Sequence, residues 1–183
     1  LAAVGTMIYR ASGGETPTTM PAGLYDLGWP PPGEDHNSFS SAAYGISLDL
    51  PPEYKKQDTE EKSPMVFSSR DGSSVSLTFK EAKVPTDMEA LVPIVIGNLE
   101  DTIPGYTVVT WRGLRLPGNV PATMLVAHGR NNSISIVTLF AIDGTRLVSV
   151  SAAAPGNKPE DVAKMKQIAE TLRLFEPDLS AMY

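Results

Sequence analysis

The chain has 183 residues and contains no cysteine. Disulfide bonds, thiolate nucleophiles, zinc–thiolate sites and cysteine-ligated iron–sulfur clusters are therefore excluded. The absence of cysteine leaves the compartment open, because cytosolic and exported domains can both lack it. A core is feasible over most of the length, since 42% of the residues are hydrophobic, as in ordinary soluble domains.

Histidine is scarce, with two residues in the whole chain. His36 follows Glu34 and Asp35, but three consecutive residues rarely converge on one ion, so a solvated acidic loop is favoured over a metal site. His128 is the single histidine base inside the predicted domain. The chain has no Gly-x-Ser-x-Gly elbow, P-loop or Gly-x-Gly-x-x-Gly motif. We therefore predict no catalytic residue, no cofactor and no metal, and a protein that is not an enzyme.

Basic charge is also in short supply, and the formal net charge is -6. Nucleic-acid-binding domains carry a clustered basic face, which this balance disfavours. Electrostatic docking onto anionic lipid is disfavoured for the same reason. Other proteins are the expected partners.

The first nine residues, Leu1 to Tyr9, are apolar or small, and Arg10 follows them. Nine residues cannot span a bilayer, which needs about 20. One interpretation takes residues 1–10 as the end of a transmembrane or signal-anchor helix that attaches the protein to a membrane. The alternative is an ordinary short helix or strand. Arg10 is a weak indication of a cytoplasmic flank.

Residues 11–43 are rich in proline and glycine and show no hydrophobic period, which predicts an extended arm. The arm nevertheless carries large apolar and aromatic side chains. They are Leu24, Tyr25, Leu27, Trp29 and Phe39. We hypothesise that these side chains bind a groove on another subunit, with Trp29 as the best anchor. The alternative is that they fold back onto their own domain.

Residues 44–176 predict one α+β domain, followed by a polar tail over 177–183. Ile46, Leu48 and Leu50 alternate with polar residues and indicate a strand. A mixed-charge run from Lys55 to Lys62 is typical of a solvated loop. A hairpin follows, whose turn is Asp71-Gly72.

Helices are predicted at two places in this domain. Thr86 and Glu89 form a capping box before a stripe of apolar residues that ends at Leu99. Asn157 is the predicted N-cap of the last helix. Between them lie four strands with short turns, which implies antiparallel neighbours. These strands are Tyr106–Leu114, Val120–His128, Ser133–Ile142 and Arg146–Ala153.

The strands and helices together predict a central antiparallel sheet of about seven strands. Its third and fourth late strands are apolar or small on both faces, so helices are expected on both sides in an α/β/α sandwich. Trp111, on the first late strand, is expected to be half-buried.

The order of elements and turns carries a resemblance. Its landmarks are the start Tyr44 to Pro52, the strand at Gly105-Tyr106, the segment Leu116 to Ala122, the hairpin Ile142 to Gly144 and the end Leu172 to Phe175. Over roughly residues 44–175 the chain resembles the Mog/PsbP-like superfamily. That superfamily includes PsbP-like photosystem accessory proteins, exported DcrB-like and LpqN-like proteins and chaperones of type VI secretion effectors. No functional residue can be carried over position by position.

What the resemblance implies is binding and not catalysis. The function predicted first is an accessory subunit that docks onto and stabilises a larger membrane-associated complex, photosynthetic or otherwise concerned with electron transfer. The alternative is a soluble chaperone or ligand-binding module of the same superfamily. The relatives also imply that the domain, tethered to a membrane through residues 1–10, lies on the extracytoplasmic side, periplasmic or lumenal, with the cytoplasmic side left open.

Overall fold

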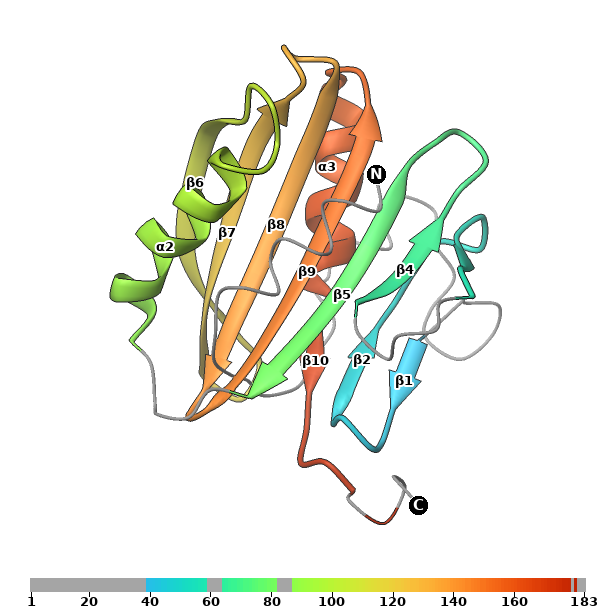
Figure 1. Ribbon diagram of the computed structural model, residues 1–183. Helices are drawn as coiled ribbons and strands as arrows, with labels where there is room; N and C mark the ends of the chain where they lie inside the picture. The colour runs from blue at the N-terminus through green and yellow to red at the C-terminus, as the bar shows by residue number, and fades with distance from the viewer. Residues whose placement is uncertain (1–38, 59–63, 82–86, 179, 181–183) are drawn as a thin grey trace.

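The computed structural model describes residues 39–58, 64–81, 87–178 and 180 (Figure 1). Its main sheet has seven strands in the spatial order β3-β4-β5-β9-β8-β7-β6, all antiparallel to their neighbours. In chain order the strands are β3 (Lys55–Lys56), β4 (Met65–Ser68), β5 (Ser74–Glu81), β6 (Thr107–Leu116), β7 (Val120–Gly129), β8 (Ile134–Asp143) and β9 (Arg146–Pro155). The predicted seven-stranded antiparallel sheet is thereby confirmed.

Two helices cover opposite faces of this sheet, α2 (Met88–Glu100) and α3 (Pro159–Glu170) (Figure 1). Strand alternation makes this possible, because successive side chains of β8 point to opposite faces. Val137, Leu139 and Ala141 join the core under α3, whereas Ile136 and Phe140 join the core under α2. The predicted sandwich is confirmed.

A second sheet of three short strands packs on the same side as α3. It consists of β1 (Phe39–Ser41), β2 (Ile46–Leu48) and β10 (Arg173–Leu174), in the order β1-β2-β10. The strand expected around residues 46–50 therefore does not belong to the main sheet. Ile46 and Leu48 pack their side chains into the core beneath α3 instead of extending the seven strands sideways. The seventh strand is β3, whose two residues open the charged run that was expected to be a solvated loop, so for Lys55 and Lys56 that expectation was wrong.

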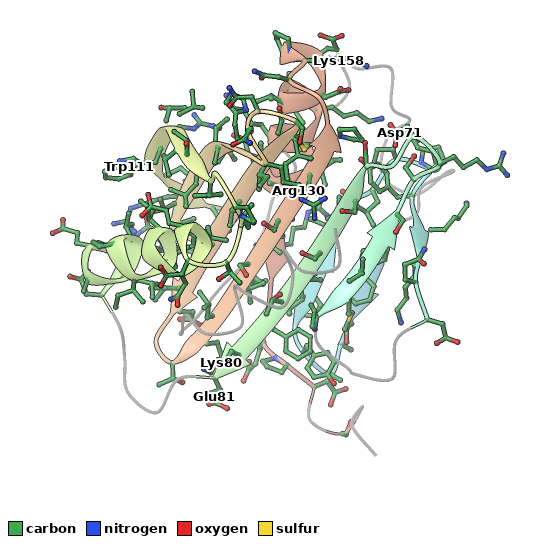
Figure 2. The ribbon with its side chains drawn as sticks, turned by 45° about the horizontal axis from the view of Figure 1, so that its top comes forward. Asp71, Lys80, Glu81, Trp111, Arg130 and Lys158 are labelled. Atoms are coloured by element: carbon green, nitrogen blue, oxygen red, sulfur yellow. The ribbon has the colours of Figure 1, made fainter. Side chains whose placement is uncertain are left out.

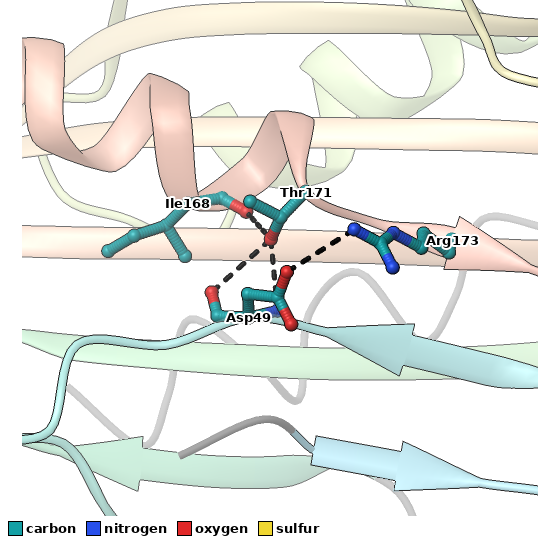
Figure 3. Close-up of polar contacts among 4 residues, drawn as sticks. All are labelled: Asp49, Ile168, Thr171 and Arg173. Atoms are coloured by element: carbon teal, nitrogen blue, oxygen red, sulfur yellow. Dashed lines mark hydrogen bonds and ion pairs between the residues drawn. The ribbon is translucent and has the colours of Figure 1, made fainter. Parts of the chain in front are cut away.

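A buried polar cluster connects the three-stranded sheet to the end of α3 (Figure 3). The Asp49 backbone N–H, just after β2, donates to the Thr171 hydroxyl at 3.0 Å. That hydroxyl lies 2.7 Å from the carbonyl oxygen of Ile168 and 3.2 Å from that of Asp49, either of which can accept its proton. The Arg173 guanidinium of β10 lies 3.6 Å from the Asp49 carboxylate. The cluster satisfies backbone groups that the ends of α3 and β2 leave unpaired.

Both helices begin one residue later than predicted. The N-cap of α2 is Asp87, whose carboxylate accepts from the Glu89 N–H at 3.2 Å. Thr86, the predicted cap, lies outside the described residues. Lys158 takes the N-cap position of α3 in place of Asn157, and its side chain makes no capping hydrogen bond. Pro159 follows in the first turn, where proline is tolerated because no N–H is needed.

Candidate protein-binding surface

The two edges of the main sheet differ in length and in protection. At one edge β3 has two residues, Lys55 and Lys56, and both are exposed. A very short edge strand made of lysines is a common protection against pairing with another chain. At the other edge β6 has ten residues, most of them exposed. In the part of the chain that the structure describes, no strand pairs with the outer side of β6.

The exposed large hydrophobic side chains lie on β6 and on α2. Among the described residues there are three, and all belong to α2 or β6: Ile94 is 54% exposed, Val109 56% and Trp111 55%. Figure 2 places Trp111 at the outer edge of the molecule, beside α2. Trp111 is opposite the buried Leu125 of β7, so its side chain is on the α2 face of the sheet. At 55% exposed, Trp111 is close to the half-buried state that was expected, and it is no more buried because one described strand, β7, pairs with β6.

An open groove of about 940 Å³ runs between α2 and β6. Its walls are mainly apolar and include Val92 and Pro93 of α2, Trp111 and Leu114 of β6 and Pro121 of β7. Gly113 also lines it, and a Cβ atom built at Gly113 would meet nothing within 4 Å. A side chain at this position of β6 would therefore project into open space.

Charged groups stand at the end of the groove nearest the start of α2. Asp87 and Glu89 contribute carboxylates, and Arg115 of β6 lies in the same lining. The Arg115 guanidinium donates to the backbone oxygen of Asn119 at 2.7 Å, which holds it near the β6–β7 turn. Arg112 extends to the opposite face of β6, where it forms an ion pair with Glu170 of α3. An apolar centre with a polar rim is the usual composition of a protein–protein interface.

The residues that the sequence suggested for partner binding do not meet at this groove as far as the structure describes them. Leu24, Tyr25, Leu27 and Trp29 lie outside the described residues. Phe39 lies in β1, where its ring contacts Phe67 edge-on at 5.6 Å between centroids, and it packs against the core under α3. For Phe39 the structure thus has the alternative arrangement, with the side chain folded back on its own domain. The three-stranded sheet accordingly begins with β1, inside the 11–43 range that was assigned to the arm.

The chemistry of the described residues offers no metal cluster, since no group of three or more His, Asp or Glu side chains is placed to hold an ion. Burial raises the pKa of the Tyr54 hydroxyl to about 12, and burial also raises the pKa of Tyr106. Both hydroxyls stay protonated at neutral pH and lie in different cores. None of the described helices is long and apolar enough to cross a membrane.

The sequence matches no protein-family model and no curated protein sequence. Solved structures do match. Cyanobacterial PsbP (CyanoP) from Synechocystis sp. PCC 6803 superimposes with a TM-score of 0.64 at 12% identity, over 80% of this chain and 97% of that one. This domain has the PsbP-like fold. The resemblance stated from the sequence is confirmed at the level of fold.

Two further structures share the PsbP-like architecture. LpqN of Mycobacterium tuberculosis, described as involved in cell envelope biogenesis, matches with a TM-score of 0.50 at 14% identity, over 72% of this chain and 83% of LpqN. The Pseudomonas aeruginosa protein PA94 matches with a TM-score of 0.50 at 13% identity, over 79% of this chain and the whole of PA94. At such identities the PsbP-like fold is shared, and function has to be argued from the surface.

Proposed function

We propose that this PsbP-like domain is a non-catalytic accessory subunit that docks onto a membrane-associated protein complex through the groove between α2 and β6. The observation that carries the proposal is Trp111, which is 55% exposed beside an apolar groove, at a sheet edge with which no described strand pairs. Exposed tryptophans of this kind are over-represented among the residues that dominate binding energy. Exposed apolar patches on soluble domains commonly mark interaction sites.

The membrane part of the proposal has separate support. The apolar residues 1–9 suit the end of a membrane anchor, and the fold is shared with CyanoP and with LpqN, a protein described as involved in cell envelope biogenesis. The proposed location is extracytoplasmic, periplasmic or lumenal, and a photosynthetic or other electron-transfer assembly is the proposed class of partner. The arm residues Leu24, Tyr25, Leu27 and Trp29 are proposed to add contacts to the same complex.

The test compares four forms of the chain in pull-downs from detergent-solubilised membranes of the source organism. They are the full chain, Trp111→Ala, Ile94→Ala and a truncation lacking residues 1–38, which keeps β1 intact. Ile94 is as exposed as Trp111 but does not line the groove, so Ile94→Ala is a matched control. An interface tryptophan contributing about 2 kcal/mol or more makes Trp111→Ala at least ~30-fold weaker in Kd.

Recovery of a defined membrane complex by the full chain and by Ile94→Ala, but not by Trp111→Ala, supports the proposal. Loss of recovery on truncation alone moves the docking site to the arm. Equal recovery of soluble proteins by all four forms contradicts an accessory role and favours the chaperone or ligand-binding alternative.

A further inference from the structure

The ten residues of β6 form the one long strand edge that is open in the described part of the main sheet. Alternate residues of an edge strand direct their N–H and C=O groups away from the neighbouring strand. Native proteins shorten, charge or cover such edges, because an open edge is a template for another chain. The opposite edge follows that rule with two lysines. Among the described strands, β6 therefore offers the edge that is suited to pairing with a further strand.

Gly113 gives the β6 edge a recess. Glycine weakens a strand interior, and it often marks a place where another backbone or side chain approaches closely. Gly113 faces the groove between Trp111 and Arg115, because side chains two residues apart share one face of a strand. A strand added outside β6 would therefore set its own groove-facing side chains beside Trp111, over Gly113 and beside Arg115. A large apolar side chain fits over Gly113, where the space is empty.

A second copy of this chain is a poorer occupant of the edge. In an antiparallel pair of two β6 strands, registers centred on Arg112 or on Arg115 would set two arginines directly opposite each other, and the register centred on Gly113 would set glycine against glycine and leave the recess empty. Like charges that face each other across strands destabilise the pairing. A segment from a different protein has no such conflict.

We propose that β6 accepts an extended segment of a partner protein as an eighth strand of the main sheet, with a large apolar side chain of that segment seated over Gly113. The inference rests on the proposed function, because it specifies how the docking partner binds the same groove. Main-chain hydrogen bonds along β6 supply affinity, and the groove selects the side chains, as in other cases of strand addition.

Gly113→Leu fills the recess and Gly97→Leu is its matched control. At both positions an added Cβ meets nothing within 4 Å, so both variants are expected to fold as the parent does. Gly97 lies on α2 outside the groove lining. Urea unfolding of the two variants verifies that the fold is intact.

The probe is a phage-displayed library of linear ten-residue peptides, selected on the full chain and counter-selected on Gly113→Leu. Enriched peptides are expected to carry apolar residues at every second position. One of them, made synthetically, is expected to bind Gly97→Leu like the parent and Gly113→Leu roughly 10–100-fold more weakly. It should also slow hydrogen exchange at alternate amides of β6. N-methylation of the alternate peptide amides that face β6 should abolish binding, whereas N-methylation of the amides that face away from β6 should not.

Several outcomes overturn strand addition. They are failure to enrich any peptide, apolar residues spaced three and four apart as in a helix, and unchanged exchange of the β6 amides in the presence of a bound peptide. Strand addition by a partner protein is also overturned if the chain forms a dimer and Gly113→Leu dissociates that dimer, because the edge is then occupied by a second copy. The proposed function fails separately, by unchanged membrane recovery of Trp111→Ala, so the two failures are distinguishable.

Discussion

Gly45, in the turn between β1 and β2, is the glycine whose replacement the structure penalises most clearly. Its φ is +63°, a conformation that alanine adopts only at a cost. A Cβ atom built at Gly45 would lie 2.0 Å from the backbone oxygen of Phe175. That atom is backbone and is held in place, because the Phe175 N–H donates to the Gly45 oxygen at 2.8 Å. Gly144 serves as the control, because its φ is +56° and a Cβ atom built there would meet nothing within 4 Å.

The magnitude follows from these contacts. Left-handed backbone costs alanine about 1–2 kcal/mol at either position. At Gly45 the chain after β10 must also move away, which breaks the hydrogen bond between Phe175 and Gly45. The Arg146 guanidinium, which donates to the Tyr44 oxygen at 2.9 Å and would lie 2.9 Å from the new Cβ, is displaced too. Losing one neutral and one charged hydrogen bond adds about 2–4 kcal/mol. We expect Gly45→Ala to cost about 3–6 kcal/mol in total and Gly144→Ala about 1–2 kcal/mol.

Urea unfolding followed by circular dichroism measures both variants, with the midpoint converted to free energy through a slope that should stay constant. The decisive quantity is the difference between the two variants, because the φ penalty cancels in it. Equal losses of stability at Gly45 and Gly144 would refute the argument that contact between the β1–β2 turn and the end of β10 limits this position.

Two other substitutions test polar contacts. Thr171→Val removes the hydroxyl that accepts from the buried Asp49 N–H. Leaving that donor unpaired should lower the free energy of unfolding by about 1–3 kcal/mol in the same urea assay. A loss below ~0.5 kcal/mol contradicts this prediction. Burial opposes the ionisation of Asp71, but hydrogen bonds from the backbone and hydroxyl of Ser73 and from Ser69 outweigh it and hold the pKa of Asp71 below 3.8. Because the folded pKa is the lower one, Asp71 stabilises the fold above pH 3.8 and loses that contribution as the pH falls through the folded pKa. The parent should therefore exceed Asp71→Asn in free energy of unfolding by an amount that shrinks as the pH falls. A difference that does not change with pH contradicts this.

Much of the fold was predictable because local sequence patterns determine it. Alternation identifies the faces of β5, and Asp71-Gly72 marks the turn that joins it to β4. Short turns between the four late strands dictate antiparallel neighbours, and the apolar stripe of α2 requires a sheet face to cover. These features depend on residues within a few positions of one another.

Assignments that depend on distant partners were not predictable. Alternation shows which face of Ile46 and Leu48 is buried but not which sheet they join, and that choice is made by β10, a strand of two residues. The exposure of Trp111 has the same origin: its local sequence suits any strand, and only the order of pairing makes β6 an edge. The start of α2 was displaced because neighbouring threonine and aspartate are both good caps, and Asp87 is the one whose carboxylate meets the Glu89 N–H. The candidate groove could therefore be located only after the strand order was known.

The pairing of β5 with β9 has a consequence for synthesis of the chain. Ser76 of β5 is opposite Ser151 of β9, 75 residues later in the sequence, whereas β6 to β9 pair with immediate neighbours. At about 5–20 residues per second, a ribosome takes roughly 4–15 s to deliver the partner of β5. During that interval β5 has only the four residues of β4 to pair with. Hydroxyl and charged side chains alternate with the apolar residues of β5 and oppose aggregation of the strand before β9 is made. Replacing these polar side chains with apolar ones should therefore lower the yield of folded protein, even where the finished fold tolerates the change.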